Sequence, residues 1–265
     1  MVVLGVILLI VGIILFFVQR DQKIRARSLR LARKVTTTEL QSMATAVADE
    51  IGGGDWRDYV KLWGDIHVES PLLSELKQQP CVHYSFSVLR EYEETIKEKN
   101  EDGQTVTRVQ RGSETLSNHS QSVPFYLVDR DGKVLVNPEG ADIDTVEIVN
   151  DFQPGDPAGG LLSYGTFRRT LSVGLGISNR RTLGYRYQES VLPLGRPILV
   201  VGEAGDQTGT VAIAKPLDDK QHFIIGLKPD DALAKEADRN AQWALWGMIG
   251  SLIGGVVLTI LGLLS

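Results

Sequence analysis

The stretch MVVLGVILLIVGIILFFV, residues 1–18, contains no charged and no strongly polar side chain. A second such stretch, WALWGMIGSLIGGVVLTILGLL, covers residues 243–264, with only Ser251 and Thr259 as mild polar interruptions. At about 1.5 Å per residue the two helices would span roughly 27 and 33 Å, against a hydrocarbon core of about 30 Å. Both are predicted to be transmembrane helices, because a bilayer offers no water to satisfy a non-helical backbone.

The first apolar stretch is interpreted as an uncleaved anchor. A secretory signal peptide carries basic residues before its apolar core and a small-residue cleavage site behind it, and neither flanks residues 1–18. Seven cations instead follow within residues 20–34, opposed only by Asp21. By the positive-inside rule this flank stays in the cytoplasm, so the domain between the two helices is expected on the cytoplasmic side.

The basic segment has two interpretations. It is a topology signal lying against anionic lipid headgroups, or it binds nucleic acid; its place beside a membrane helix favours the first. The chain carries a net charge of −5 and residues 20–34 carry +6, so the remainder carries −11. Such an acidic body has no electrostatic reason to hold a polyphosphate. No nucleic-acid partner is expected.

The pattern after the basic segment predicts one more helix and then a β-rich body. Thr36 and Glu39 fit a capping box, and three glycines end the helix that is expected over residues 36–51. Residues 151–181 contain eight glycines and prolines and are expected to form a flexible loop or mobile insert. Elsewhere alternating apolar residues predict strands over 60–68, 81–96, 105–116, 123–128, 133–136, 143–149, 185–191, 197–203, 210–214 and 222–227.

These elements predict a membrane-anchored α+β protein that is mostly β. A barrel-like or sandwich-like domain, or two abutting small sheets, would lie between N- and C-terminal transmembrane helices. The expected segments are a transmembrane helix (1–18), a basic stalk with an amphipathic helix (19–51), a single β-rich domain (55–230), and a helix that runs into the second transmembrane helix (231–264).

Glycines recur in both apolar stretches. Gly250 and Gly254 form a GxxxG spacing, and Gly5 and Gly12 share one face of the first helix. Such spacings let helices approach closely. The two anchors would then pair within the chain or form a homo-oligomer, although glycine is also simply frequent in membrane helices. The expected partners are the lipid bilayer and a protein partner or a second copy of this chain.

The sequence holds few residues typical of catalysis. Cys81 is the single cysteine, so residues 1–265 cannot supply a zinc ribbon, a RING or an internal disulfide. Cys81 and His83 are two apart in a predicted strand and are expected to share a face, as a thiolate and its imidazole partner would. A buried thiol beside a histidine at the rim fits the same spacing. Apart from these two candidates, no catalytic residue is expected, and no cofactor or metal ligands.

Five motifs follow one another between the apolar helices: SPLLSE (70–75), PCVHY (80–84), SVPFYLVD (122–129), YRYQESVLPLG (185–195) and VVGE (200–203). In this order they resemble the GIDE family, also called the BAM or "beside a membrane" family. The family includes mitochondrial and chloroplast membrane E3 ubiquitin ligases and bacterial relatives. The resemblance implies a β-rich domain between two transmembrane helices, followed in the organellar members by a RING that recruits the conjugating enzyme. Because this chain lacks the zinc-binding cysteines, it resembles a bacterial-type member without the RING, and no active-site residue is carried over.

Three functions are compatible with these observations. Two anchors, an acidic body and the lack of a catalytic constellation favour a non-catalytic binding or scaffold module beside a membrane. The family resemblance implies an E3-like ubiquitin transferase, acting as a scaffold or through a Cys81 thioester. A membrane hydrolase with residues dispersed through the glycine-rich segment 151–181 is the third.

Overall fold

A computed structural model describes residues 2–51, 56–99, 104–156, 160–170, 180–206 and 210–264. These residues form two compact units, each built from separate stretches of the chain. Unit 1 combines Met1–Ile66, Tyr126–Ile143 and Pro197–Ser265, and unit 2 combines His67–Phe125 and Asp144–Arg196. Residues 55–230, which were predicted as one β-rich domain, therefore contribute to both units.

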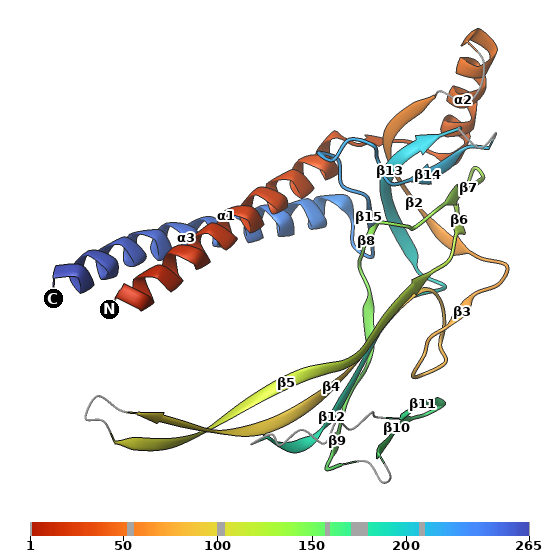
Figure 1. Ribbon diagram of the computed structural model, residues 1–265. Coiled ribbons are helices and arrows are strands. Elements are labelled where there is room, and N and C mark those ends of the chain that lie inside the picture. Colours follow the sequence, from red (N-terminus) through yellow and green to blue (C-terminus); the bar gives the residue numbers. More distant parts are fainter. Residues whose placement is uncertain are drawn as a thin grey trace. The chain divides into compact units, whose positions relative to one another are not determined.

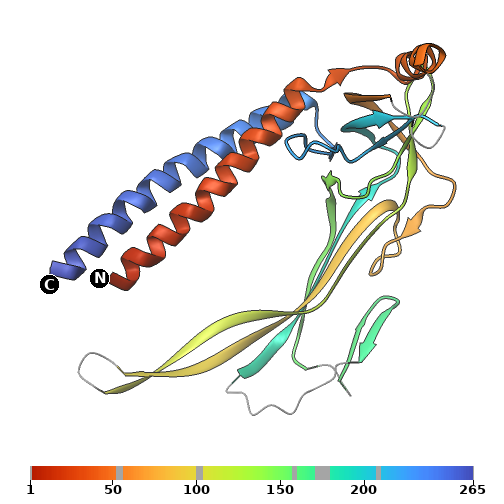
Figure 2. The ribbon, with the colours of Figure 1, turned by 45° about the horizontal axis from the view of Figure 1, so that its top comes forward.

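Three helices belong to unit 1: α1 (Val2–Leu31), α2 (Thr37–Ile51) and α3 (Asp230–Leu264). α1 and α3 run side by side and antiparallel, with the two termini of the chain close together (Figures 1 and 2). α1 does not end with its apolar stretch but continues through the basic segment, and α3 likewise runs unbroken from a polar first half into an apolar second half. Both helices are long and apolar enough to cross a membrane, as predicted.

The capping box at the start of α2 is confirmed. The Thr36 N–H donates to Glu39 Oε2 at 2.8 Å, and the Glu39 N–H donates to Thr36 Oγ1 at 3.3 Å. The next N–H, that of Thr37, donates to Asp129 Oδ2 at 2.8 Å. The first turn of α2 is therefore fixed by a carboxylate that lies 92 residues further along the chain.

The sheet of unit 1 is barrel-like, which is one of the alternatives that the sequence predicted for a mostly β protein. Its strand order is β1-β2-β6-β7-β14-β13-β15-β8, and an additional pairing of β2 with β13 closes five of these strands into a ring. Within the ring β7 and β14 are parallel, whereas β13 is antiparallel to β2 and to β14. Taken in chain order, the ring reads 1-2-3-5-4 with strands 3 and 5 parallel, which is the topology of OB-fold barrels. The bounds are β1 (Arg33–Lys34), β2 (Arg57–His67), β6 (Phe125–Val128), β7 (Lys133–Val136), β8 (Asp142–Ile143), β13 (Pro197–Gly205), β14 (Ala212–Ala214) and β15 (Ile224–Gly226).

The central strand β13 is buried on both faces. Leu199 and Val201 join a core with Leu29 of α1 and Leu233 of α3, and Ile198 and Val200, which alternate with them, are also fully buried. This packing explains why residues 198–201 form an uninterrupted apolar run rather than an alternating one. The polar ends of the two long helices are thus attached directly to the barrel-like sheet.

Unit 2 is a second sheet with a small hairpin beside it. The sheet has the order β3-β4-β12-β9, and β5 pairs with β4. The antiparallel hairpin β10–β11 turns at Gly165, whose φ of 55° favours glycine. The expectation of a loop was wrong for this part of 151–181, because Leu162 and Phe167 of the hairpin are buried in the core of the unit. The bounds are β3 (Leu72–Leu73), β4 (Pro80–Lys99), β5 (Thr105–Ser122), β9 (Val146–Pro154), β10 (Leu161–Tyr164), β11 (Phe167–Thr170) and β12 (Arg180–Pro193).

Candidate functional site

The face of the unit 2 sheet opposite its core is polar. Side chains alternate along a strand, so the residues that alternate with Tyr84, Phe86 and Val88 of the core point the other way. On β4 these are His83, Ser85 and Ser87. The strand registers place more polar side chains beside them: Asn118, Ser120 and Ser122 on β5, Arg186, Gln188 and Ser190 on β12, and Glu147 and Asn150 on β9.

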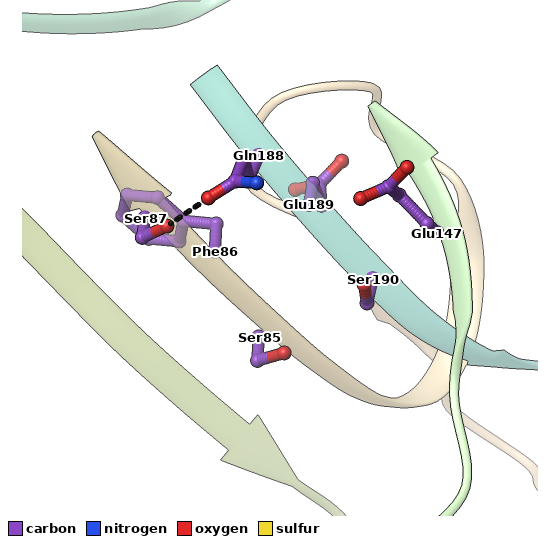
Figure 3. A pocket seen from close by; sticks show the side chains of 7 residues that line it. All are labelled: Ser85, Phe86, Ser87, Glu147, Gln188, Glu189 and Ser190. Atoms are coloured by element: carbon purple, nitrogen blue, oxygen red, sulfur yellow. Dashed lines mark hydrogen bonds between the residues drawn. The ribbon is translucent and has the colours of Figure 1, made fainter. Parts of the chain in front are cut away.

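A groove of about 260 Å³ lies on this sheet (Figure 3). Ser85 and Ser87 line it from β4, Gln188 and Ser190 from β12, and Glu147 from β9; Phe86 and Glu189 complete the lining. The groove exists because serine side chains are short, whereas the flanking glutamine and glutamate are long. Small-molecule sites usually measure about 300–1,000 Å³. This groove therefore suits one amino-acid side chain or a small polar group rather than a large cofactor.

The polar face offers hydroxyl and amide groups with little positive charge. Glu147 is exposed, and its two carboxylate oxygens accept hydrogen bonds from Asn150 Nδ2 at 3.3 and 3.2 Å. The Arg186 guanidinium, by contrast, is paired with Glu91 at 2.6 Å. Burial lowers the pKa of His83 below its ordinary value, so its imidazole is neutral at pH 7. The groove consequently favours neutral or cationic groups over anions.

Glu189 stabilises the sheet from the core side. Its buried carboxylate accepts hydrogen bonds from Ser74 Oγ at 3.0 Å, from the Leu76 N–H at 2.6 Å and from the Lys77 N–H at 3.0 Å. These charge-assisted bonds hold the 74–77 turn against β12, and with it Leu76, which is part of the core. The strand that supplies Gln188 and Ser190 to the groove is therefore fixed from behind.

Cys81 and His83 do not form the pair that their spacing suggested. The pairing of β4 with β12 skips Val82, and this bulge turns Cys81 into the core that contains Tyr84, whereas His83 lies on the polar face. The Cys81 thiol is fully buried and lies 3.8 Å from the Leu72 carbonyl oxygen, and His83 Nδ1 lies 2.7 Å from Ser122 Oγ. Burial, with a smaller effect of Glu189, raises the pKa of the thiol to about 11. A thiolate is strongly disfavoured there at neutral pH.

The glycines of α1 lie in its contact with α3. A Cβ at Gly5 would lie 2.8 Å from the Gly255 carbonyl oxygen, and a Cβ at Gly12 would lie 2.7 Å from Leu252 Cδ2. Gly5 and Gly12 therefore lie where the two apolar helices pair within one chain, which is one of the interpretations given for these glycines. On α3 Ser251 and Gly255 are buried small residues of this contact, whereas no atom lies within 4 Å of a Cβ built at Gly250.

A partly buried lysine attaches both long helices to the barrel-like sheet. Lys61 of β2 donates from Nζ to the Leu29 carbonyl oxygen of α1 at 2.9 Å and to Asp230 Oδ2 of α3 at 2.6 Å. The cation thus lies at the carboxyl end of α1, and the anion at the amino end of α3, which are the positions that helix dipoles favour. The Lys61 hydrogen bond lowers the pKa of Asp230.

The groove residues were not among the predicted site residues, although the sequence contains a signal for some of them. In the strand predicted over 81–96, Tyr84, Phe86 and Val88 alternate with Ser85 and Ser87, so the serines occupy the opposite side. Which residues of β9 and β12 lie beside these serines depends on the strand registers, and these include a bulge at Ile148. The hydrophobic periodicity of a single strand does not contain the register with its neighbours.

The described residues thus combine two helices long and apolar enough to cross a membrane, a barrel-like sheet and a second sheet with a small polar groove. The model of the GIDE family, described as an E3 ubiquitin ligase, matches residues 93–261. This match covers more than half of the chain, and the chain therefore belongs to the GIDE family.

A named relative agrees with this assignment. Over 154 residues the chain is 27% identical to the E3 ubiquitin-protein ligase SPL1 of Arabidopsis thaliana, a match that covers 56% of this chain. The chain spans only 41% of the length of that relative. No solved structure matches the chain at a comparable level of significance.

Proposed function

We propose that this chain is the membrane-anchored binding module of a ubiquitin-ligase-like protein. α1 and α3 cross the bilayer as a pair, and the groove of unit 2 binds a side chain of a protein partner. The observation that carries the proposal is the groove itself, which is polar, the size of one side chain, and built on a sheet fixed from behind by Glu189. We expect the partner to present a neutral or cationic side chain, because the groove contains hydroxyl, amide and carboxylate groups.

The surfaces of the two long helices support membrane crossing. Only 17% of the most apolar window of α1 and 11% of that of α3 are buried within the protein. Side chains such as Ile7, Ile14 and Ile253 are at least half exposed, and a core helix of a soluble protein would cover them. Hydrocarbon is the environment that suits such surfaces. Retention of the full chain in the pellet after carbonate extraction tests this part, and release into the aqueous fraction contradicts it.

The charge distribution around α1 predicts on which side of the membrane the sheets lie. The cations behind Val18 keep that end of α1 in the cytoplasm, so both sheets lie on the cytoplasmic side. Because Cys81 is the single cysteine, a Cys81→Ala chain with Ser113→Cys, at an exposed hairpin position, provides one labelling site. An impermeant maleimide should label it only after the membrane is opened. Labelling of sealed cells contradicts the orientation.

The second candidate function is ubiquitin transfer, which the description of the family and the name of the plant relative favour. Residues 1–265 supply one thiol, which is buried with a raised pKa, so a transfer step would need groups beyond these residues or a different chemistry. The test incubates the full chain with ubiquitin-charged conjugating enzyme. We expect neither faster discharge nor a thioester on Cys81. Discharge that persists in Cys81→Ala would support a ligase, and a thioester lost in Cys81→Ala would support a cysteine enzyme.

The groove is tested by photo-crosslinking. A photoreactive amino acid in place of Gln188 should crosslink a discrete protein, and the same amino acid in place of the exposed Lys97 serves as the matched control within unit 2. Ser85→Arg, which fills the groove, should abolish the Gln188 crosslink. Crosslinks that are unchanged by Ser85→Arg contradict binding in the groove.

Self-association through α3 is a further part of this proposal. A Cβ at Gly254 would lie 3.6 Å from Leu8 Cδ1 of α1, whereas Gly250 is left open by the contact with α1 and is the position of the GxxxG pair that a second helix can approach. Gly250→Leu should reduce a dimer fraction measured by sedimentation in detergent. An unchanged sedimentation profile contradicts a contact at this position.

A further inference from the structure

We propose that Arg20, Lys23 and Arg27 of α1 form a site for the headgroups of anionic phospholipids. The inference rests on the membrane crossing of α1 proposed above and adds the class of lipid that surrounds it. The inference rests on a difference within the basic segment: some of its cations form ion pairs within the protein, and others do not.

Three arginines of the basic segment are engaged in unit 1. Arg25 pairs with Asp142, Arg30 with Asp238 and Arg33 with Asp58. These pairs connect the segment to β8, α3 and β2, so they serve the attachment of the helix rather than contact with lipid. The seven cations of residues 20–34 are therefore not one uniform topology signal.

The other cations of α1 stay available. Arg20, Lys23 and Arg27 are exposed and have no ion pair among the described residues. At three and seven residues apart they lie within about 60° of one another on the helix surface. Asp21 lies about 100° or more from each of them around the helix and faces His222, and Glu236 of α3 pairs with Lys228. The three free charges thus form one positive strip.

The chain direction of α1 makes the side chains of this strip lean toward the bilayer. Side chains on an α-helix lean toward its amino end, and for α1 that end lies in the membrane. The Cα atoms of Arg20, Lys23 and Arg27 lie roughly 3, 7 and 13 Å beyond Val18. Long cationic side chains that lean back over such distances reach the headgroup layer. Cations on α3 lean the opposite way, away from the bilayer, so Arg239 is not part of the site.

Exposed aromatic side chains mark the same level of the helix pair. Because Gly12 meets Leu252 and Gly5 meets Gly255, the antiparallel register places Trp243 and Trp246 beside the stretch from Phe17 to Arg20. The two tryptophans are 74% and 70% exposed. Indole rings concentrate where hydrocarbon meets the headgroups. The positive strip therefore begins at the depth at which lipid phosphates lie.

Fluorescence quenching in nanodiscs tests the site, because Trp243 and Trp246 report on the lipids beside them. The full chain is reconstituted into phosphatidylcholine discs in which either phosphatidylglycerol or part of the phosphatidylcholine carries bromine. We expect the brominated anionic lipid to quench more strongly than the brominated neutral lipid. Each free cation contributes a preference of about five-fold near an anionic surface, and the preference should fall as salt is raised.

Variants identify the cations responsible. Arg20→Gln with Lys23→Gln and Arg27→Gln should lower the preference by up to about 100-fold. Arg20→Lys with Arg27→Lys keeps the charge and should retain it. Lys97→Gln with Arg108→Gln and Arg168→Gln removes the same charge from exposed positions of unit 2 and should change nothing.

Each outcome decides the question. Equal quenching by the two lipids in the unaltered chain, or a preference that survives the triple glutamine variant, overturns the lipid site and leaves the membrane crossing standing. Failure of the chain to enter the discs overturns the membrane crossing and the lipid site together. A preference that is lost in the charge-matched control of unit 2 shows a general effect of net charge and also overturns the site.

Discussion

Asp129 joins two segments that are far apart in the sequence, and removing its carboxylate should loosen both. Oδ2 accepts the Thr37 N–H at 2.8 Å, and Oδ1 accepts Thr37 Oγ1 at 2.6 Å and the N–H groups of Asp131 and Gly132, each at 2.9 Å. Two of these bonds belong to the first turn of α2 and two to the turn between β6 and β7. Asp129→Ala therefore removes a helix cap and a turn brace in one change.

The magnitude follows from these four bonds. Loss of a helix cap costs about 0.5–2 kcal/mol. The turn amides lie near solvent and are rehydrated when the carboxylate is lost, so they add less than the 1–3 kcal/mol of a buried unsatisfied group. We expect a total near 2 kcal/mol, which corresponds to a roughly 30-fold increase in local opening. Amide hydrogen exchange of the full chain in detergent should show it at Thr37, Asp131 and Gly132.

Three measurements complete this test: a control variant, the coupling between Thr37 and Asp129, and the dependence of stability on pH. Asp131→Ala removes the same charge from the same turn without losing the bonds of Asp129, and should have little effect. Burial raises the pKa of Asp129, but the hydrogen bonds from Thr37, Asp131 and Gly132 outweigh it and the net pKa is lowered. The stabilisation is therefore present above the unfolded pKa near 4 and is lost as pH falls through the lower folded pKa. Unchanged exchange at Thr37, or additive effects of Thr37→Ala and Asp129→Ala, would refute the reasoning.

The structure gives three further predictions. Glu189→Ala should destabilise unit 2 by about 3–5 kcal/mol in denaturant unfolding, because it leaves the buried amides of the 74–77 turn without an acceptor, whereas Glu147→Ala at an exposed position should stay within about 0.5 kcal/mol. The Cys81 thiol, with a pKa of about 11, should resist iodoacetamide at pH 8 in the folded chain and react once the chain is unfolded, and mass spectrometry that finds rapid native alkylation would contradict its burial. Gly5→Leu should weaken the contact of α1 with α3 by roughly 1–3 kcal/mol in detergent titrations, because the new side chain meets a backbone carbonyl, and Gly250→Leu should leave that contact unchanged.

Periodicity alone recovered most of the elements. The alternation in Val82–Val88 and the capping box at Thr36 reflect local rules, so a single segment contains the information for each. The same local reading was wrong for residues 161–170. Glycines there indicate a turn, but burial of Leu162 and Phe167 against a distant strand makes the flanking residues a hairpin.

The candidate site depends on registers that no single segment contains. The serines of β4 become a groove only because β12 and β9 place Gln188 and Glu147 beside them. A bulge at Val82 likewise separates Cys81 from His83, although their spacing predicts a shared face. A bulge changes which side of a strand a residue occupies without leaving a mark in the hydrophobic pattern.

The interleaving of the two units sets an order for biosynthesis. Strand β2 is synthesised early, but β13 and β14, which complete its ring, follow only after every strand of unit 2 has left the ribosome. At about 5–20 residues per second this delay is roughly 7–30 s. During that time the second sheet is free to fold while β2 keeps one edge unpaired, a state in which strands recruit unintended neighbours. Nascent chains of this protein should therefore depend on a chaperone most strongly between the emergence of β2 and that of β13.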